Sequence, residues 1–240
     1  MTDNRTPATG SAHGSTPAVR LVVLDMAGTT VADDGLVELA FSRAAAELGV
    51  EPGSADHTAK LEYVRATMGE SKITVFRALF GDEERARRAN SAFELAYAAL
   101  VDGGRCAPLP GAAEAIAALR ADGRKVALTT GFSRTTQDAI LDALGWQDIA
   151  DLTLCPSDAG RGRPYPDMVL TALLRTGTDA VREVAVAGDT AYDMLSGVRA
   201  GAALVAGVLT GAHGEAQLRA AGATHVLPSV AALPALVRGE

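Results

Sequence analysis

Short apolar runs alternate with longer amphipathic segments along most of this chain, and this alternation is the feature that most restricts its fold. The apolar runs have the length of buried strands, whereas the amphipathic segments have helical spacing. The expected strands are 21–25, 125–130, 151–155, 183–188, 203–208 and 224–227. The expected helices among them are 112–121, 133–144, 166–174, 191–200 and 214–221. This order predicts an α/β fold, a doubly wound parallel sheet joined by right-handed crossovers.

One interval breaks the alternation, because no strand signal occurs between the first expected strand and the second. Four helical patterns occupy this interval, at 36–48, 54–68, 72–80 and 83–101. An ordinary crossover between parallel strands is much shorter. We therefore expect residues 35–105 to form a separate helical cap above the carboxyl edge of the sheet. The core of the fold is then expected to comprise residues 19–34 and 106–240.

Composition restricts the partners that the protein could have. The chain has 240 residues, and 22 Lys and Arg against 29 Asp and Glu give it a formal charge of −7. No long basic run offsets this balance, so nucleic acid is not an expected partner. No apolar run approaches the roughly 18 residues of a membrane-spanning helix, so no membrane association is expected either. Residues 1–18 are polar, lack the apolar centre of a secretory signal and are expected to form a disordered tail. A cytoplasmic protein with reduced cysteines is the resulting expectation.

Reactive side chains gather at the ends of four expected strands. They are Asp25 after the first strand, Thr130 after the second, Arg161 and Arg163 after the third, and Asp189 after the fourth. The carboxyl ends of parallel strands meet at one edge of a sheet, which is where open α/β sheets bind their ligands. We therefore expect these residues to converge on one crevice.

Two of these carboxylates indicate a metal site. Asp25 and Asp189 offer an oxygen-only environment, which suits Mg²⁺. Asp193 lies four residues beyond Asp189 on the next helix, so it is a candidate ligand or an acceptor behind the ligands. Taken alone, Asp189 could be the N-cap of that helix. Its pairing with a second strand-end carboxylate favours the metal interpretation, with Mg²⁺ as the expected cofactor.

Other groups at this edge can bind phosphate. The Thr130 hydroxyl can donate a hydrogen bond, and Arg163 can bind phosphoryl oxygens through its planar fork. Backbone amides around Gly28 and Gly131 can form an anion-binding nest. Taken singly, Thr130 could be a turn residue and Arg163 a solvated loop residue. Their joint occurrence at strand ends predicts phosphoryl transfer involving a small-molecule phosphate or phosphonate.

Five short motifs, in their order along the chain, point to a known superfamily. They are DMAGTTV, MGESK, TTGF, GRPYP and GDTAYDM. They resemble the haloacid dehalogenase-like (HAD) hydrolases, and more narrowly the phosphonoacetaldehyde hydrolase (phosphonatase) branch of that superfamily. Most members have a second Asp two residues after the nucleophile, where this chain has Ala27. The resemblance implies a Rossmann-like HAD core with an inserted helical cap.

The resemblance also implies roles for individual residues. Asp25 is the expected nucleophile, and Lys72 of MGESK is the expected amine that forms a Schiff base with the substrate aldehyde. Mg²⁺ is expected on Asp25, Asp189 and the backbone carbonyl of Ala27. Residues expected to contact the phosphoryl group or the organic group are Thr130, Arg163, Gly28, Thr29, Gly131, Phe132 and Met68. Related enzymes suggest a homodimer formed through the cap.

The chain departs from the phosphonatase pattern on the side of the substrate aldehyde. A proton-shuttling histidine is expected three residues after the lysine, where this chain has Val75. A cysteine is expected near Leu36, and an aromatic hydroxyl is expected where Phe132 stands. No histidine is an obvious replacement, and all four are expected at the surface or in packing: His13, His57, His213 and His225. The phosphoryl side of the pattern is intact.

Three functions fit these residues. The first is a Mg²⁺-dependent hydrolase that cleaves the C–P bond of phosphonoacetaldehyde or a related carbonyl phosphonate. Its carbon leaves as a neutral enamine, so it does not need the general acid that Ala27 cannot provide. The second is a HAD-type phosphatase for a small-molecule phosphate ester, with Lys72 as an electrostatic clamp. The third is a non-catalytic protein that binds a phosphorylated ligand.

Overall fold

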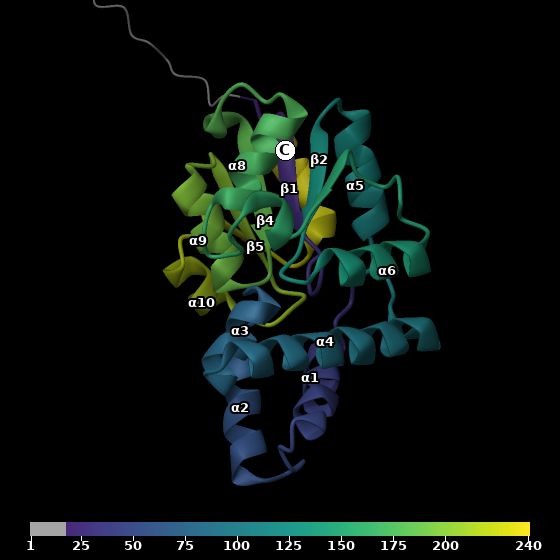
Figure 1. The fold of residues 1–240 in the computed structure, drawn as a ribbon. Coiled ribbons are helices and arrows are strands. Elements are labelled where there is room, and N and C mark those ends of the chain that lie inside the picture. The colour runs from purple at the N-terminus through teal and green to yellow at the C-terminus, as the bar shows by residue number, and fades with distance from the viewer. Residues whose placement is uncertain (1–17) are drawn as a thin grey trace, which may run out of the picture.

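A computed structural model of the chain describes residues 18–240 and is built around a parallel sheet (Figure 1). The sheet has six strands in the order β3-β2-β1-β4-β5-β6. The strands are β1 (Leu21–Asp25), β2 (Lys125–Thr129), β3 (Leu152–Leu154), β4 (Val184–Gly188), β5 (Leu204–Val208) and β6 (His225–Leu227). All the predicted strands are confirmed, and the order reverses beside β1, as in a doubly wound fold.

β1 lies in the middle of the sheet and is buried on both faces. It pairs in parallel with β2 on one side and with β4 on the other. Val22 and Leu24 pack in the hydrophobic cluster on one face, whereas Leu21 and Val23 pack in the cluster on the other. Successive side chains of a strand point to opposite faces, so a strand covered on both sides is apolar at every position. The apolar run ends where the strand ends, which places Asp25 at the carboxyl edge.

Helices cover both faces of this sheet (Figure 1). Those of the core are α5 (Ala112–Ala121), α6 (Arg134–Leu144), α7 (Pro156–Ala159), α8 (Asp167–Thr176), α9 (Ala191–Ala200), α10 (Glu215–Ala220) and α11 (Leu233–Arg238). Side chains of α5 and α6 join the cluster of Leu24, whereas side chains of α8 and α9 join the cluster of Leu21. The five predicted core helices are confirmed to within a few residues.

Two of these helices were not predicted. α7 is a single turn, which is too short to show a helical period in the sequence. α11 contains Pro234 as its second residue, and a proline in an apolar stretch suggests a break. Proline is nevertheless compatible with the first turn of a helix, because that position has no intrahelical partner for its missing amide.

The interval between β1 and β2 folds as a separate helical layer, which is the cap (Figure 1). Its helices are α1 (Leu36–Glu47), α2 (Ala55–Ala66), α3 (Lys72–Phe80) and α4 (Glu83–Leu100). The chain enters the cap through Asp34 and Gly35, at φ 42° and 75°. It leaves through a π-helical turn, Val101–Arg105, in which Gly104 has φ 73°. The helical insert is confirmed, while its limits at 35–105 stay a prediction.

Aromatic rings form the centre of the cap and connect it to the core. Phe76 of α3 lies with its ring centroid 6.1 Å from that of Phe41 and 5.7 Å from that of Phe93. Tyr97 of α4 is 4.7 Å from Phe132, which belongs to the loop after β2 in the core. Such rings contribute a large buried area and favour offset or tilted contacts. The cap therefore docks on the core through the same cluster that holds it together.

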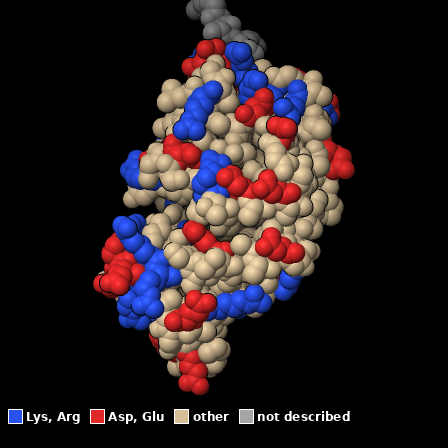
Figure 2. Space-filling model, turned by 45° about the vertical axis from the view of Figure 1, so that its right-hand side comes forward, with Lys and Arg blue, Asp and Glu red and all other residues tan. Residues whose placement is uncertain are grey.

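The surface and the chain end carry fewer constraints. On the face shown in Figure 2, acidic and basic side chains are interspersed over both core and cap. Within residues 18–240, no helix is both long and apolar enough to cross a membrane. The tail predicted for residues 1–18 lies outside the described residues apart from its last member, and so does His13.

Replacing Phe76 by Ala should destabilise the cap by about 3–5 kcal/mol, because a large buried ring is lost and a cavity remains. Urea unfolding followed by circular dichroism measures the change in the free energy of unfolding. Leu95→Ala on α4 is the control, since that side chain is 74% exposed. It should change the free energy by less than about 0.5 kcal/mol. Equal effects of the two substitutions would show that Phe76 is not part of the cap core.

Candidate active site

A tight loop after β1 presents Asp25 at the carboxyl edge of the sheet. The carbonyl of Met26 accepts the amides of Thr29, Thr30 and Val31 at 3.1, 2.8 and 2.8 Å. Such a loop requires a left-handed residue, and Gly28 supplies it with φ 82°. These three hydrogen bonds form within the loop itself, and they hold the Asp25 carboxylate at the end of the buried strand.

Three buried carboxylates meet at this edge. Oxygens of Asp25, Asp189 and Asp193 all lie within 4.8 Å of one another. Burial raises the pKa of Asp25 to about 6, even though Arg163 acts to lower it. Burial and the charges of the other two acids also hold the pKa of Asp189 well above its ordinary value. An excess of buried negative charge carried by oxygen atoms fits a divalent cation such as Mg²⁺.

Arg163 is the buried cation that balances part of this charge. One of its terminal nitrogens lies 2.5 Å from Asp25 Oδ1, and the other lies 2.7 Å from Asp193 Oδ1. The second oxygen of Asp193 accepts the hydroxyl and amide of Thr190 at 2.6 and 3.1 Å. Both Asp193 oxygens are thus engaged, which favours the second of its two predicted roles, an acceptor behind the ligands, over the first, a metal ligand. Arg161, in contrast, pairs with Asp167 in an exposed position outside the site.

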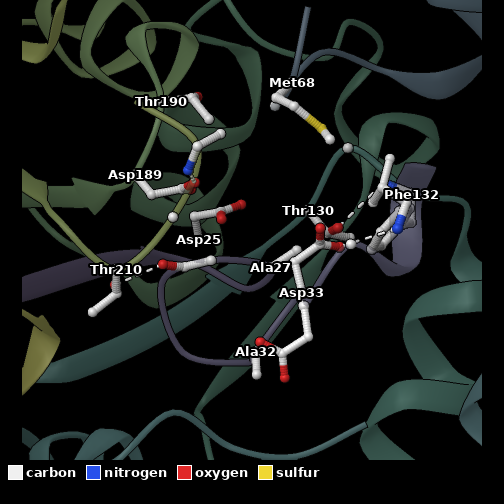
Figure 3. Close-up of a pocket in the computed structure, with 18 of the residues that line it drawn as sticks. Asp25, Ala27, Ala32, Asp33, Met68, Thr130, Phe132, Asp189, Thr190 and Thr210 are labelled. Atoms are coloured by element: carbon white, nitrogen blue, oxygen red, sulfur yellow. Dashed lines mark hydrogen bonds between the residues drawn. The ribbon is translucent and has the colours of Figure 1, made fainter. Parts of the chain in front are cut away.

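A loop after β5 completes the surroundings of Asp189, and its residues were not predicted. Asp189 Oδ2 accepts the amide of Ala212 at 2.7 Å. The Thr210 hydroxyl donates to the carbonyl of Gly28 at 2.7 Å (Figure 3). A Cβ on Gly211 would lie 1.9 Å from Asp189 Oδ2, so only glycine fits there. Applying the strand-end rule to the fifth strand would have found this loop.

The cap reaches the site through a segment of small residues. The amide of Lys72 donates to the carbonyl of Gly131 at 3.1 Å. A Cβ on Gly131 would lie 2.6 Å from the carbonyl oxygen of Glu70. A Cβ on Gly69 would lie 2.4 Å from Thr190 Oγ1. The two layers are therefore in direct contact around the cavity, and glycines permit this approach.

Lys72 is buried beside Phe132 at the start of α3. Its ammonium lies 5.4 Å from the centroid of the Phe132 ring. Burial lowers the pKa of Lys72 to about 8, while Asp33 acts to raise it and Arg163 to lower it. Burial disfavours the charged form of an amine, so a fraction of Lys72 is neutral and nucleophilic near physiological pH.

A cavity of about 290 Å³ lies between the core and the cap. Most of the predicted site residues line it: Asp25, Ala27, Gly28, Met68, Lys72, Thr130, Gly131, Phe132, Arg163 and Asp189. Figure 3 labels Asp25, Ala27, Met68, Thr130, Phe132 and Asp189 among them. The predicted residues Thr29 and Asp193 lie behind the wall, where they contact Asp189 and Arg163. Asp33 also lines the cavity, although sequence reasoning did not single it out.

The polar groups missing from the phosphonatase pattern are not replaced by histidine. Val75 is buried in the cap. The ring of His57 lies 3.1 Å from the Ser42 hydroxyl, and the ring of His213 accepts the amide of Ala191 at 2.9 Å. His225 is exposed. Within residues 18–240, no histidine lines the cavity.

Addition of Mg²⁺ should raise the melting temperature, because a cation that binds only the folded state adds about 2.7 kcal/mol at a hundredfold excess over its Kd. Asp189→Asn should remove most of this shift, since it deletes one carboxylate charge. Asp167→Asn, which alters only the pair with Arg161, should retain it. Differential scanning fluorimetry at constant pH measures the shifts. Equal shifts in wild type and Asp189→Asn would argue against a cation at the triad.

Comparison with known proteins agrees with this architecture. The family model described as "haloacid dehalogenase-like hydrolase" matches residues 19–201. In overall fold the chain is similar to a phosphonoacetaldehyde hydrolase-like protein from Oleispira antarctica, with a TM-score of 0.80 and 24% identity over 93% of each chain. It is also similar to a hydrolase from Pseudomonas syringae, with a TM-score of 0.79 and 23% identity over 92% of this chain and 99% of the other.

Similarity in sequence extends to curated relatives. The chain is 32% identical to "Probable phosphatase IndB" of Dickeya dadantii over 84% of its length and 86% of the relative. It is 30% identical to the phosphonoacetaldehyde hydrolase of Bacillus cereus over 76% of its length and 73% of the relative. The protein therefore belongs to the haloacid dehalogenase-like hydrolases, and it is an enzyme rather than a non-catalytic binding protein.

Proposed function

We propose that this hydrolase cleaves the C–P bond of phosphonoacetaldehyde or a related carbonyl phosphonate. One observation carries the proposal: Lys72, a buried amine with a lowered pKa, lines the same cavity as the Asp25 carboxylate. A nucleophilic carboxylate alone would serve any phosphoryl transfer. A nucleophilic amine opposite to it is the group that a carbonyl substrate needs.

The phosphoryl half of the reaction belongs to the core. Asp25, Asp189 and the carbonyl of Ala27 would hold Mg²⁺, which when bound supplies positive charge to the phosphoryl oxygens. Arg163 and Thr130 would orient the phosphoryl group in front of Asp25. The Asp25 carboxylate then attacks phosphorus and becomes an aspartyl-phosphate while the C–P bond breaks. Water next attacks this aspartyl-phosphate, which releases phosphate and restores the Asp25 carboxylate.

The carbon half belongs to the cap. The neutral amine of Lys72 attacks the substrate carbonyl, and loss of water gives a protonated imine. This group accepts the electron pair of the C–P bond, so the carbon fragment departs as a neutral enamine. The leaving carbon needs no proton from position 27, which agrees with the methyl side chain of Ala27. Phe132 and Met68 keep the surroundings of the amine apolar.

A phosphatase acting on a small phosphate ester is the second candidate, supported by the resemblance to the Dickeya dadantii relative. In that reaction Lys72 would only attract the substrate's negative charge. The two functions differ in whether a covalent bond forms between Lys72 and the substrate.

Borohydride added during turnover of phosphonoacetaldehyde should reduce the imine and fix a two-carbon adduct on Lys72. Lys72→Met should abolish both the adduct and C–P cleavage. Lys125→Met is the control, because Lys125 pairs with Asp151 at the surface. Mass spectrometry of peptides locates the adduct. Full turnover of a phosphate ester by Lys72→Met, with no adduct from any carbonyl phosphonate in wild type, would favour the phosphatase.

Gly69→Ala should lower kcat by about a hundredfold, because a Cβ directed at Thr190 Oγ1 would displace the lysine-bearing segment by roughly an ångström. Gly53→Ala is a matched control in the same cap. Gly53 has a similar φ of 79°, but its Cβ would meet no atom within 4 Å. Comparison of kcat for the two variants by steady-state kinetics should therefore distinguish the effect of contact with the core from the effect of backbone strain. Equal loss of kcat in both variants would contradict the role of this close approach.

A further inference from the structure

One acid on the cavity wall has no role in the chemistry above. Asp33 lies in the loop between Asp25 and α1, and it lines the cavity together with Lys72. Figure 3 labels Asp33 beside two further lining residues, Met68 and Phe132. Of the charged groups that act on Lys72, Asp33 has the largest effect on its pKa. Asp33 therefore shares the cavity wall with the reactive amine and acts on it through its charge.

The other acids on this part of the wall are committed elsewhere. Glu38 receives two hydrogen bonds from Arg65, at 2.8 and 2.7 Å, at the surface of the cap. Asp34 is exposed to solvent. These carboxylates lack either the freedom or the burial that a proton donor inside the cavity needs, whereas Asp33 is half-buried.

Asp33 is held in place by the first turn of α1. Its backbone carbonyl accepts the amide of Leu36 at 2.7 Å. Its carboxylate oxygen Oδ1 accepts the amide of Val37 at 3.3 Å. Anchoring at two points fixes the position of the carboxyl group relative to the cavity, which proton transfer requires.

The hydroxyl groups on the wall cannot serve in its place. The Thr130 hydroxyl accepts the amide of Phe132, and the Thr210 hydroxyl donates to the carbonyl of Gly28. Aliphatic hydroxyls also do not titrate near neutral pH. Glu70, two residues before Lys72, also feels the charge of the ammonium, but it does not line the cavity. With no histidine on the cavity wall within residues 18–240, Asp33 is the acid of that wall that is neither ion-paired nor exposed nor part of the acidic triad.

We propose that Asp33 is the proton donor and acceptor for imine formation and hydrolysis at Lys72. This inference rests on the proposed function and supplies the group that Val75 lacks. It differs from the arrangement expected from the phosphonatase pattern, because the carboxyl group comes from the loop before the cap and not from α3.

The proton balance is as follows for each half of the cycle. The amine nitrogen of Lys72 bonds to the carbonyl carbon, and its proton passes to the carbonyl oxygen. Protonated Asp33 donates to that hydroxyl, the C–O bond breaks, water leaves and the nitrogen lone pair completes the C=N bond. After C–P cleavage, solvent protonates the enamine carbon. Asp33 carboxylate then takes a proton from the water that adds to the C=N bond, which restores the acid and leaves a carbinolamine. The hydroxyl proton of this carbinolamine passes to nitrogen, the C–N bond breaks, and the aldehyde leaves neutral Lys72.

The groups facing Asp33 support this role. Burial and the charge of Glu38 raise the pKa of Asp33, while the Val37 amide and Lys72 of α3 act to lower it. From α4, the buried Tyr97 hydroxyl has no hydrogen-bond partner among the described residues, and the charge of Asp33 acts to raise its pKa. The net raised pKa of Asp33 and the lowered pKa of Lys72 bring the two groups closer in acidity. A protonated acid and a neutral amine can therefore coexist in part of the population.

The test uses Asp33→Asn, which keeps the shape and an acceptor for the Val37 amide. Borohydride trapping at Lys72 and kcat for C–P cleavage should both fall by about 10²–10⁴-fold. Binding of vanadate with Mg²⁺, measured by calorimetry, should stay unchanged because the phosphoryl side is intact. Asp33→Ser, which also retains a helix-capping acceptor, should show the same loss, and Asp33→Glu should recover part of the rate.

Asp82→Asn is the matched control. Asp82 begins α4 in the same manner, accepting the amide of Arg85 at 2.8 Å, and does not line the cavity. In this variant, borohydride should trap the imine at Lys72 at the wild-type rate. A loss of trapping limited to the Asp33 variants would therefore not result from a weakened helix start.

The pH profile of trapping separates proton transfer from a structural effect. In wild type the rate should fall as the pH rises above about 8, because Lys72 is already neutral there while protonated Asp33 becomes scarcer. In Asp33→Asn the rate should rise to a plateau near pH 8 and not fall. Wild-type rates and an unchanged profile in folded Asp33→Asn or Asp33→Ser would overturn this inference and leave the proposed function standing. Absence of any adduct in wild type would instead reject the proposed function.

Discussion

Mutual repulsion among three carboxylates buried in a small space is the constraint on which this site depends. Asp25, Asp189 and Asp193 come from the ends of β1 and β4 and from the first turn of α9. Arg163 offsets part of their charge by bridging two of them. Burial, together with the charges of the neighbouring acids, raises the pKa of Asp25 and Asp189, so the folded core favours any cation that can lie between them. The loops around the triad hold the three carboxylates close together against the repulsion between their charges.

The cap contributes a basic group to the site, Lys72, and the shift of its pKa has a different cause. Lys72 has a lowered pKa mainly because it is buried, and it is buried because Gly69 and Gly131 allow the cap to touch the core. Contacts between Phe132 and the cap ring of Tyr97 seal the same region. The core thus concentrates negative charge, while the cap removes water from a single amine. A substrate with a phosphoryl group at one end and a carbonyl at the other matches this division.

Much of this arrangement was accessible from the sequence, for physical reasons that particular residues illustrate. An entirely apolar strand ending in Asp25 requires a sheet covered on both faces and an acid at its edge. The same rule cannot show which of the two arginines, Arg161 or Arg163, is buried in the site. Both lie between β3 and α8. Only packing shows that Arg163 enters the triad while Arg161 pairs with Asp167.

Two features were missed because residue type does not reveal them. The loop after β5 could have been located from its place at a strand end, but its contributions, a backbone amide at Ala212 and the lack of a side chain at Gly211, have no chemical signature in a sequence. Asp33 stands next to Asp34, and two adjacent acids before a glycine resemble a solvated turn. Asp33 becomes half-buried through three-dimensional contacts that no local pattern specifies.

The contact between Lys72 and the Phe132 ring has a consequence for selectivity inside a cell. Hydration of this amine would return its pKa toward the ordinary value and leave it protonated at neutral pH. An ammonium does not attack aldehydes, so the reactivity of Lys72 depends on the packing of the cap against the core. The same packing that joins the two layers thus governs which carbonyl compounds can meet a neutral amine.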